Sequence, residues 1–139
     1  MARRKTWQEK LDNGREPKVV RLKKDFAGVA AGSDLLVSTP REVDTFIRRI
    51  PAGRFVDPRQ LREKLASKYS ADAACPVSTG IFLRIVGEAA WEEIQKGKDA
   101  SQVTPLWRVV APGSSLEQRL NCGPAFVRKM QRQEGIAVS

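Results

Sequence analysis

The residues that could carry covalent chemistry are two cysteines, Cys75 and Cys122, each just before an expected helix. A thiol near a helix N-terminus can have a lowered pKa and act as a nucleophile. The chain contains no histidine, which excludes Ser-His-Asp and Cys-His-Asp sites and every histidine-ligated metal site in it. We therefore interpret the cysteines as free, half-buried thiols, with an enzyme that uses Cys75 as an alternative.

Other chemical motifs are missing from the sequence. Two cysteines are too few for a Cys-rich zinc site. Glu92 and Glu93 are adjacent, and adjacent residues on a helix do not face one another, so they form no acid–base pair. We find no glycine-rich phosphate loop and no metal motif, and we expect no cofactor.

The balance of charge favours an anionic partner. The 139 residues hold 25 Lys and Arg against 16 Asp and Glu, a net charge of +9. Residues 1–24 hold nine basic and three acidic side chains and residues 105–139 hold five and two, whereas the middle of the chain is balanced. Basic ends suit nucleic acid, although they also serve solubility. With no apolar run long enough for a membrane span and no export signal, we expect a cytoplasmic protein that does not bind membranes.

Capping signals predict the elements that would position a site. Thr39-Pro40-Arg41-Glu42 places an N-cap, a proline at the first helical position and a glutamate three residues after the cap, which predicts a helix over about 40–50. Asp57-Pro58-Arg59-Gln60 predicts the start of a second helix in the same way. Residues 17–22 alternate weakly, as a strand or an extended arm would.

Three further elements are expected towards the C-terminus. Residues 76–97 form the longest apolar-periodic stretch and predict a helix capped by Ser78 or Thr79. Its expected inward face consists of Ile81, Phe82, Ile85, Ala89 and Ile94. Residues 106–118 are rich in β-prone side chains around Pro112-Gly113 and predict a two-stranded wing. Residues 123–134 predict a last helix with Phe126, Val127 and Met130 inward.

The order of helix, helix, helix, wing and helix predicts a mainly α-helical fold with a small β wing, a winged helix-turn-helix. We expect a basic, partly extended N-terminal arm over residues 1–38 and the winged-helix domain over residues 39–139. We expect a monomer.

Four segments resemble one known family. Residues 39–136, about 70% of the chain, are similar to the DNA-binding C-terminal domain of alkylguanine-DNA alkyltransferases and to the alkyltransferase-like proteins. The segments are Val56–Leu61 (VDPRQL), Arg84–Ala90 (RIVGEAA), Pro105–Val110 (PLWRVV) and Gly123–Gly135. They match, in order, the start of the helix-turn-helix, the recognition helix, the active-site strand and the last helix.

The sequence departs from this family where the family's reaction takes place. Leu106 stands at the position of the alkyl-accepting cysteine, Trp107 at that of the activating histidine, and Pro58 at that of the base-pushing tyrosine. An aliphatic carbon cannot accept an alkyl group and an indole cannot act as a general base. We therefore predict no alkyltransferase activity.

The resemblance implies a DNA-binding face. Arg84 aligns with the arginine that enters the minor groove and replaces an extruded base, and Gly87 would let the helix approach the sugars. Phosphate contacts are expected from Arg59, Arg62, Arg108 and the basic N-terminal arm, which includes Arg3 and Arg4. In the alternative interpretation, Arg84 pairs with Glu88 on the helix surface and does not enter DNA. The nearby Glu88, Glu92 and Glu93 count against DNA binding, because their charges repel phosphates.

The resemblance also implies a pocket at Pro58, Leu106, Trp107 and Glu134. Glu134 aligns with a buried glutamate whose partner is the missing histidine, so we expect the Trp107 indole N–H to donate to it directly or through water. Alternatively, Glu134 is an exposed carboxylate at a helix end and Trp107 is a core residue.

Together these features predict a non-catalytic protein that binds duplex DNA, and the resemblance implies that it senses damaged or alkylated bases in DNA repair. The alternative is a protein-interaction module on the same scaffold that does not bind DNA.

Overall fold

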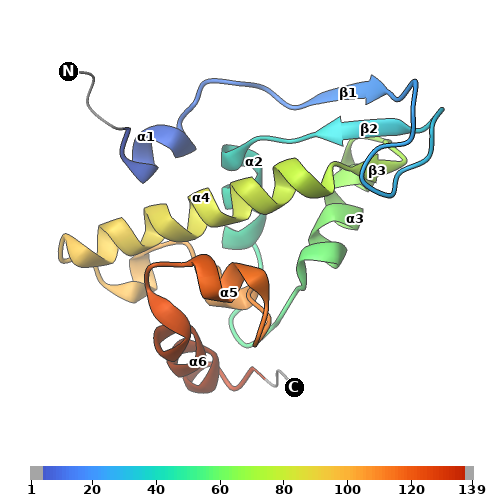
Figure 1. Ribbon diagram of the computed structural model, residues 1–139. Coiled ribbons are helices and arrows are strands. Elements are labelled where there is room, and N and C mark those ends of the chain that lie inside the picture. Colours follow the sequence, from blue (N-terminus) through green and yellow to red (C-terminus); the bar gives the residue numbers. More distant parts are fainter. Residues whose placement is uncertain (1–4, 137–139) are drawn as a thin grey trace.

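The computed structural model describes residues 5–136 and is mainly helical, with a small three-stranded sheet (Figure 1). Arg3 and Arg4, expected to contact phosphates, lie outside the described residues. None of the helices within residues 5–136 has an apolar stretch that could cross a lipid bilayer.

The two helices predicted from capping signals are confirmed. Helix α2 (Pro40–Arg48) begins after Thr39, whose hydroxyl accepts the N–H of Glu42. Helix α3 (Pro58–Lys68) begins after Asp57, which exchanges hydrogen bonds with Gln60 in a capping box. In both helices the proline occupies the first turn, where no N–H is needed.

The long helix α4 (Pro76–Gln95) crosses the middle of the molecule and contacts most other helices (Figure 1). Its cap is Cys75, whose sulfur accepts the N–H of Ser78, so the prediction of Ser78 or Thr79 as cap was wrong. The chain becomes helical at Pro76, because proline fixes a helical φ, and both residues therefore lie inside the first turn. Gly97 follows the helix with φ +101°, as its predicted place at the helix end requires.

The predicted inward face of α4 is confirmed in part, because Ala89 is buried and Phe82, Ile85 and Ile94 are half-buried against the core, but Ile81 is wrong. Leu83, Val86 and Ala90 are buried, whereas Ile81 is 55% exposed and Ile85 is half-buried. Other elements pack on several sides of α4. The prediction assumed a single apolar face and therefore did not identify all of the buried residues. Exposed Val77 and Ile81 consequently share a solvent-facing surface with Arg84.

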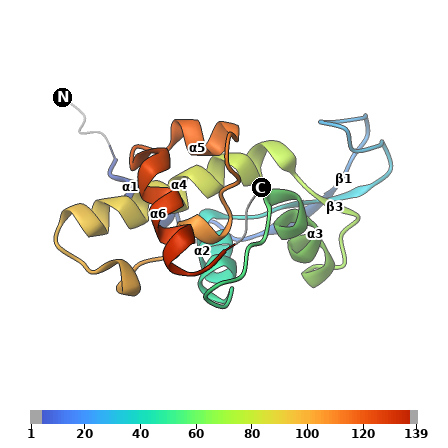
Figure 2. The same ribbon diagram turned by 90° about the horizontal axis from the view of Figure 1, so that it is seen from below.

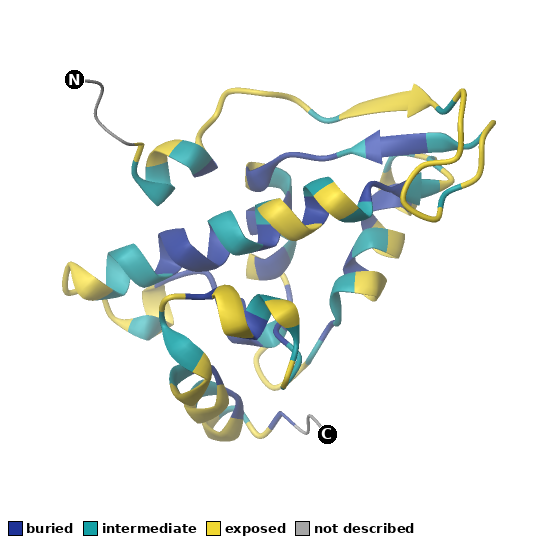
Figure 3. Cartoon of the chain, viewed as in Figure 1, coloured by how far each residue is buried: buried dark blue, intermediate teal, exposed yellow. Residues whose placement is uncertain are grey.

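The sheet lies outside the segment predicted to form a wing. Strands β1 (Lys18–Arg21), β2 (Asp34–Val37) and β3 (Ala73–Ala74) are arranged in that order, with β1 antiparallel and β3 parallel to β2. Buried Leu36 pairs with Val19 on one side and with Ala74 on the other. Every residue of β1 is exposed, next to the buried leucines of β2 (Figure 3).

Residues 106–118 contain no strand, so the predicted wing there was wrong. Leu106–Arg108 is a 3₁₀ helix and Ser115–Arg119 is helix α5. Ser114 accepts the N–H of Glu117, and the buried Glu117 carboxylate accepts the N–H of Gly113 and pairs with Arg128. This serine and glutamate form a helix-start signal, which overrides the β preference of the valines before it.

Helix α6 (Gly123–Gln133) confirms the expected last helix, with Val127 buried and Phe126 and Met130 half-buried. Buried Gln131 donates to the carbonyl oxygens of Trp107 and Val110 and so ties α6 to the 3₁₀ segment. Figure 1 shows α5 and α6 below α4, and both views place the sheet and α3 at the N-terminal end of α4 (Figures 1 and 2).

One apolar cluster joins these elements. It contains Leu11 of helix α1 (Trp7–Leu11) and Leu36 of β2 together with residues of α2, α3, α4 and α6. Parts of the first 38 residues are therefore packed into the same core as the rest. Burial of such large side chains contributes about 1.5–3 kcal/mol each.

Candidate nucleic-acid interface

A groove of about 860 Å³ runs along the exposed face of α4, and we call it the α4 groove. Its lining includes Val77, Ile81 and Arg84 of α4, Pro58 at the start of α3, Trp7 and Lys10 of α1, and Ser114, Ser115 and Arg119 around α5. Three of the lining residues are cations, and no carboxylate lines the groove among residues 5–136. Such a surface combines apolar contact area with positive charge.

Arg84 is half-exposed in this groove, with 40% of its side chain accessible. Its Nε lies 3.7 Å from a Glu88 carboxylate oxygen, and its guanidinium carbon lies 5.3 Å from the centre of the Trp7 ring. Nε is buried and has no hydrogen-bond partner among residues 5–136. The inner edge of the guanidinium therefore faces Glu88, while the rest of the group borders the groove.

The three glutamates of α4 that were expected to repel phosphates bind groups of the protein itself. Glu88 is buried and accepts the N–H of Asn121. Burial raises the pKa of Glu88, which the Asn121 N–H and Arg84 partly oppose. Glu92 accepts the backbone N–H groups of α1, and Glu93 pairs with Lys98. Their charge is thus partly offset within the fold.

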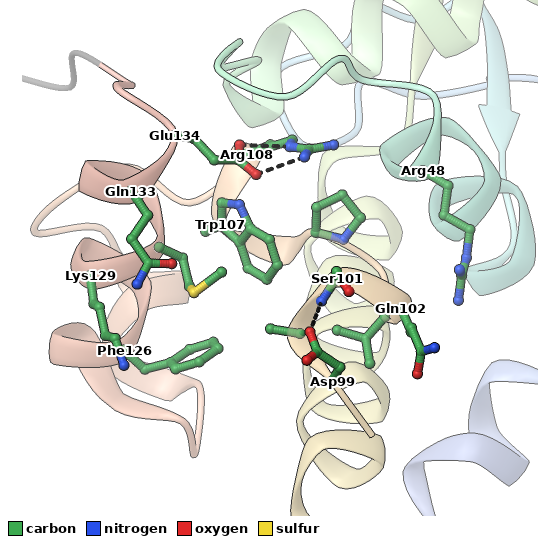
Figure 4. A pocket seen from close by; sticks show the side chains of 14 residues that line it. Arg48, Asp99, Ser101, Gln102, Trp107, Arg108, Phe126, Lys129, Gln133 and Glu134 are labelled. Carbon is green, nitrogen blue, oxygen red and sulfur yellow. Dashed lines mark hydrogen bonds and ion pairs between the residues drawn. The ribbon is translucent and has the colours of Figure 1, made fainter. Parts of the chain in front are cut away.

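The second large hollow, of about 730 Å³, lies between α6, the end of α2 and residues 99–105 (Figure 4). Trp107, Arg108 and Glu134 line it. Arg108 donates to both Glu134 oxygens, at 2.9 and 2.7 Å, and to the carbonyl of Ile50 at 2.7 Å. The N–H of Gly53 also donates to Glu134.

Glu134 therefore pairs with Arg108 and is only 14% exposed. The hydrogen bonds from Arg108 and Gly53 lower its pKa from 4.5 to about 2, against the opposing effect of burial. The Trp107 indole N–H points toward the same carboxylate and adds to this lowering (Figure 4), but its geometry does not meet that of a hydrogen bond. The expected direct bond from Trp107 is thus replaced by the one from Arg108, because a charged donor competes better for a carboxylate.

Comparison with protein-family models, with curated proteins and with solved structures gives no match to this chain.

The four residues expected to form one pocket are not brought together. Pro58 lines the α4 groove beside Arg84, whereas Trp107 and Glu134 line the hollow at α6. Leu106 is buried, with 2% exposed, and lines neither. Trp107 is also 2% exposed and meets Phe126 edge-on with 6.2 Å between ring centres, as a core aromatic does.

Arg59 and Arg62 lie beside the α4 groove. Both line a hollow of about 550 Å³ between α3 and the tip of the β1–β2 hairpin, and Pro76 lines this hollow and the α4 groove alike. Arg59 is 81% exposed and only loosely paired with Glu63 at 3.4 Å. Arg59 is therefore available to a ligand that extends beyond the groove, whereas Arg62 is half-buried in this hollow, which Glu63 and Asp72 also line.

Arg108 and Gly87 have structural positions instead. Arg108 is 14% exposed and its guanidinium is bound to Glu134 and Ile50, so we remove it from the set of phosphate contacts. Gly87 is buried against α5, because a Cβ there would lie 2.7 Å from a methyl carbon of Leu120. Gly87 thus allows close packing of two helices rather than an approach to DNA.

Replacing Gly87 with valine should lower the free energy of unfolding by about 1–3 kcal/mol, as overpacking of a core does. The matched control is Gly80→Val on the same helix, where a Cβ meets nothing within 4 Å and the change should be nearly neutral. Urea denaturation of both variants measures the difference. Equal stabilities would contradict the packing role of Gly87.

Trp7 and Arg119 were not predicted as site residues, and Lys10 was predicted only as one of the basic residues of the N-terminal arm. Trp7 and Lys10 are separated from α4 by more than 65 positions, and only the docking of α1 brings them to the groove. Arg119 comes directly after the predicted wing, in a stretch for which no element was predicted. The sequence signal that could have indicated this part of the site is the Thr6–Glu9 capping box, because it predicts that α1 forms a helix.

The cysteines do not have the character of nucleophiles. Cys75 is buried at the cap of α4. Burial, together with the charge of Glu88, raises the pKa of Cys122 from 9.0 to about 11, which leaves its thiol protonated near neutral pH. No cluster of metal-ligating side chains occurs within residues 5–136.

Proposed function

We propose that this chain is a non-catalytic, cytoplasmic DNA-binding protein of the alkyltransferase-like type, and that its α4 groove receives the duplex. The observation that carries the proposal is that Arg84, Lys10 and Arg119 border one groove without a carboxylate among its described lining residues. Such a surface attracts a polyanion, and its apolar floor at Val77 and Ile81 suits sugars and base edges.

In this proposal, α3 and α4 act as a helix-turn-helix with α4 as the reading helix, and Arg59 and Arg62 contact the flanking backbone. An extruded or alkylated base would enter the groove beside Pro58 and Arg84. The residues at the positions of the family's cysteine and histidine, Leu106 and Trp107, are buried, which supports binding without alkyl transfer.

The test is a titration of a fluorescently labelled duplex, followed by anisotropy at several salt concentrations. Contact of the three groove cations and of Arg59 and Arg62 with phosphates predicts a slope of about −4.5 for the logarithm of the binding constant against the logarithm of salt. Parallel titrations with abasic and alkylguanine-containing duplexes should show tighter binding if damaged bases are sensed. Absence of binding at low salt would overturn the proposal.

The alternative is a protein-interaction module. The exposure of Val77 (53%) and Ile81 (55%) favours it, because exposed apolar side chains are common at protein interfaces. It predicts no duplex binding.

A further inference from the structure

Helix α1 is held against α4 at a defined position. The Glu92 carboxylate accepts the backbone N–H groups of Trp7 and Gln8, each at 3.1 Å. The Gln8 side-chain amide donates to the carbonyl of Ala89 and to the carboxylate of Glu93. These bonds fix the first turn of α1, so the Trp7 side chain projects from an anchored backbone.

Two cations that border the α4 groove lie over the ring of Trp7. The Lys10 ammonium is 4.2 Å from the ring centre and the Arg84 guanidinium carbon is 5.3 Å from it. Both cations are attracted by the negative face of an indole. One aromatic ring thus holds together two like charges that would otherwise repel each other.

A flexible Lys or Arg loses side-chain freedom when it binds a phosphate, which weakens the contact. A ring that already orders both side chains reduces this loss. Two neighbouring cations, with Arg119 across the same groove, also provide a strong local field for an anion.

We propose that Trp7 is a positioning residue of the nucleic-acid interface, which orders the side chains of Arg84 and Lys10 at the edge of the α4 groove for contact with a phosphodiester backbone. This inference rests on the proposed function. Helix α1 lies outside the segments that resemble the family. In this proposal it forms one wall of the α4 groove.

The experiment is a double-mutant cycle measured by anisotropy of a labelled duplex, with Trp7→Leu, Arg84→Ala and the double variant. Trp7→Leu should weaken binding about 5- to 10-fold, whereas Trp7→Phe, which keeps a ring, should stay within about 2-fold of the wild type. In the Arg84→Ala background the effect of Trp7→Leu should fall to about 2-fold. If Trp7 only supported the fold, Trp7→Leu would weaken binding by the same factor in the wild-type background and in the Arg84→Ala background.

A second measurement is independent of the folding of Trp7→Leu. The fluorescence of Trp7, obtained as the difference between wild type and Trp7→Phe, should become at least about 2-fold less accessible to acrylamide when duplex is added. No protection, or no coupling in the cycle, overturns the inference while wild-type binding still supports the proposed function. If the wild type binds no duplex at all, both proposals fail.

Discussion

Exchange of Glu134 for glutamine should lower the free energy of unfolding by about 3 kcal/mol at pH 7. The change leaves the largely buried Arg108 guanidinium without its anionic partner, and breaking such a pair is strongly destabilising. Urea denaturation of the wild type and of Glu134→Gln measures this loss of unfolding free energy. The matched control is Glu63→Gln, whose carboxylate is 66% exposed and which should change stability by less than about 0.5 kcal/mol.

The same pair predicts a dependence of stability on pH. The pKa of Glu134 is about 2 in the folded protein and 4.5 without its partners, so the unfolded state binds the proton first as the pH falls. The stabilisation by Glu134 is therefore fully present above pH 4.5 and is lost between pH 4.5 and about 2. The difference in stability between wild type and Glu134→Gln should shrink across that range. A difference that stays constant down to pH 2 would contradict the assignment.

Replacement of Arg84 by alanine should weaken duplex binding about 30-fold, because a charged hydrogen-bonding contact in a groove contributes about 2 kcal/mol. Arg84 also faces the buried Glu88 carboxylate at 3.7 Å, so its loss should lower the melting temperature as well, and binding is measured at a temperature where the variant is folded. Arg84→Lys should recover part of the affinity, since it keeps the charge but not the planar guanidinium. Anisotropy at fixed salt measures each variant.

The matched control for Arg84 is Arg132→Ala. Arg132 is an exposed arginine on α6 and does not line the α4 groove. Its removal should change binding less than about 2-fold. Equal losses for the two arginines would mean that the duplex is held by net charge alone.

Local signals in the sequence were sufficient for α2, α3 and α6, because caps, prolines and glycines act within a few residues. They indicated β1 within residues 17–22, predicted as a strand or an extended arm, but were insufficient for the rest of the sheet, where Leu35 pairs with Ala73 across 38 positions. They were also misleading at residues 106–118, where Val109 and Val110 are buried by tertiary packing rather than paired in strands.

The candidate site was predicted in part for the same reason. Arg84, Arg59 and Arg62 could be named from the resemblance, and they lie on or beside one groove. The partners of charged groups could not be predicted, because they depend on contacts distant in sequence. Glu92 binds α1 across 84 and 85 positions, and Arg108 takes the place at Glu134 that the resemblance suggested for Trp107.

We propose that duplex DNA binds in the α4 groove. The most direct test follows backbone amide shifts by NMR while a short duplex is added to the protein. The account predicts the largest changes at residues 77–85, 114–119 and 7–10, with little change at residues 126–134. Changes confined to the hollow at α6, or no changes at low salt, would contradict it.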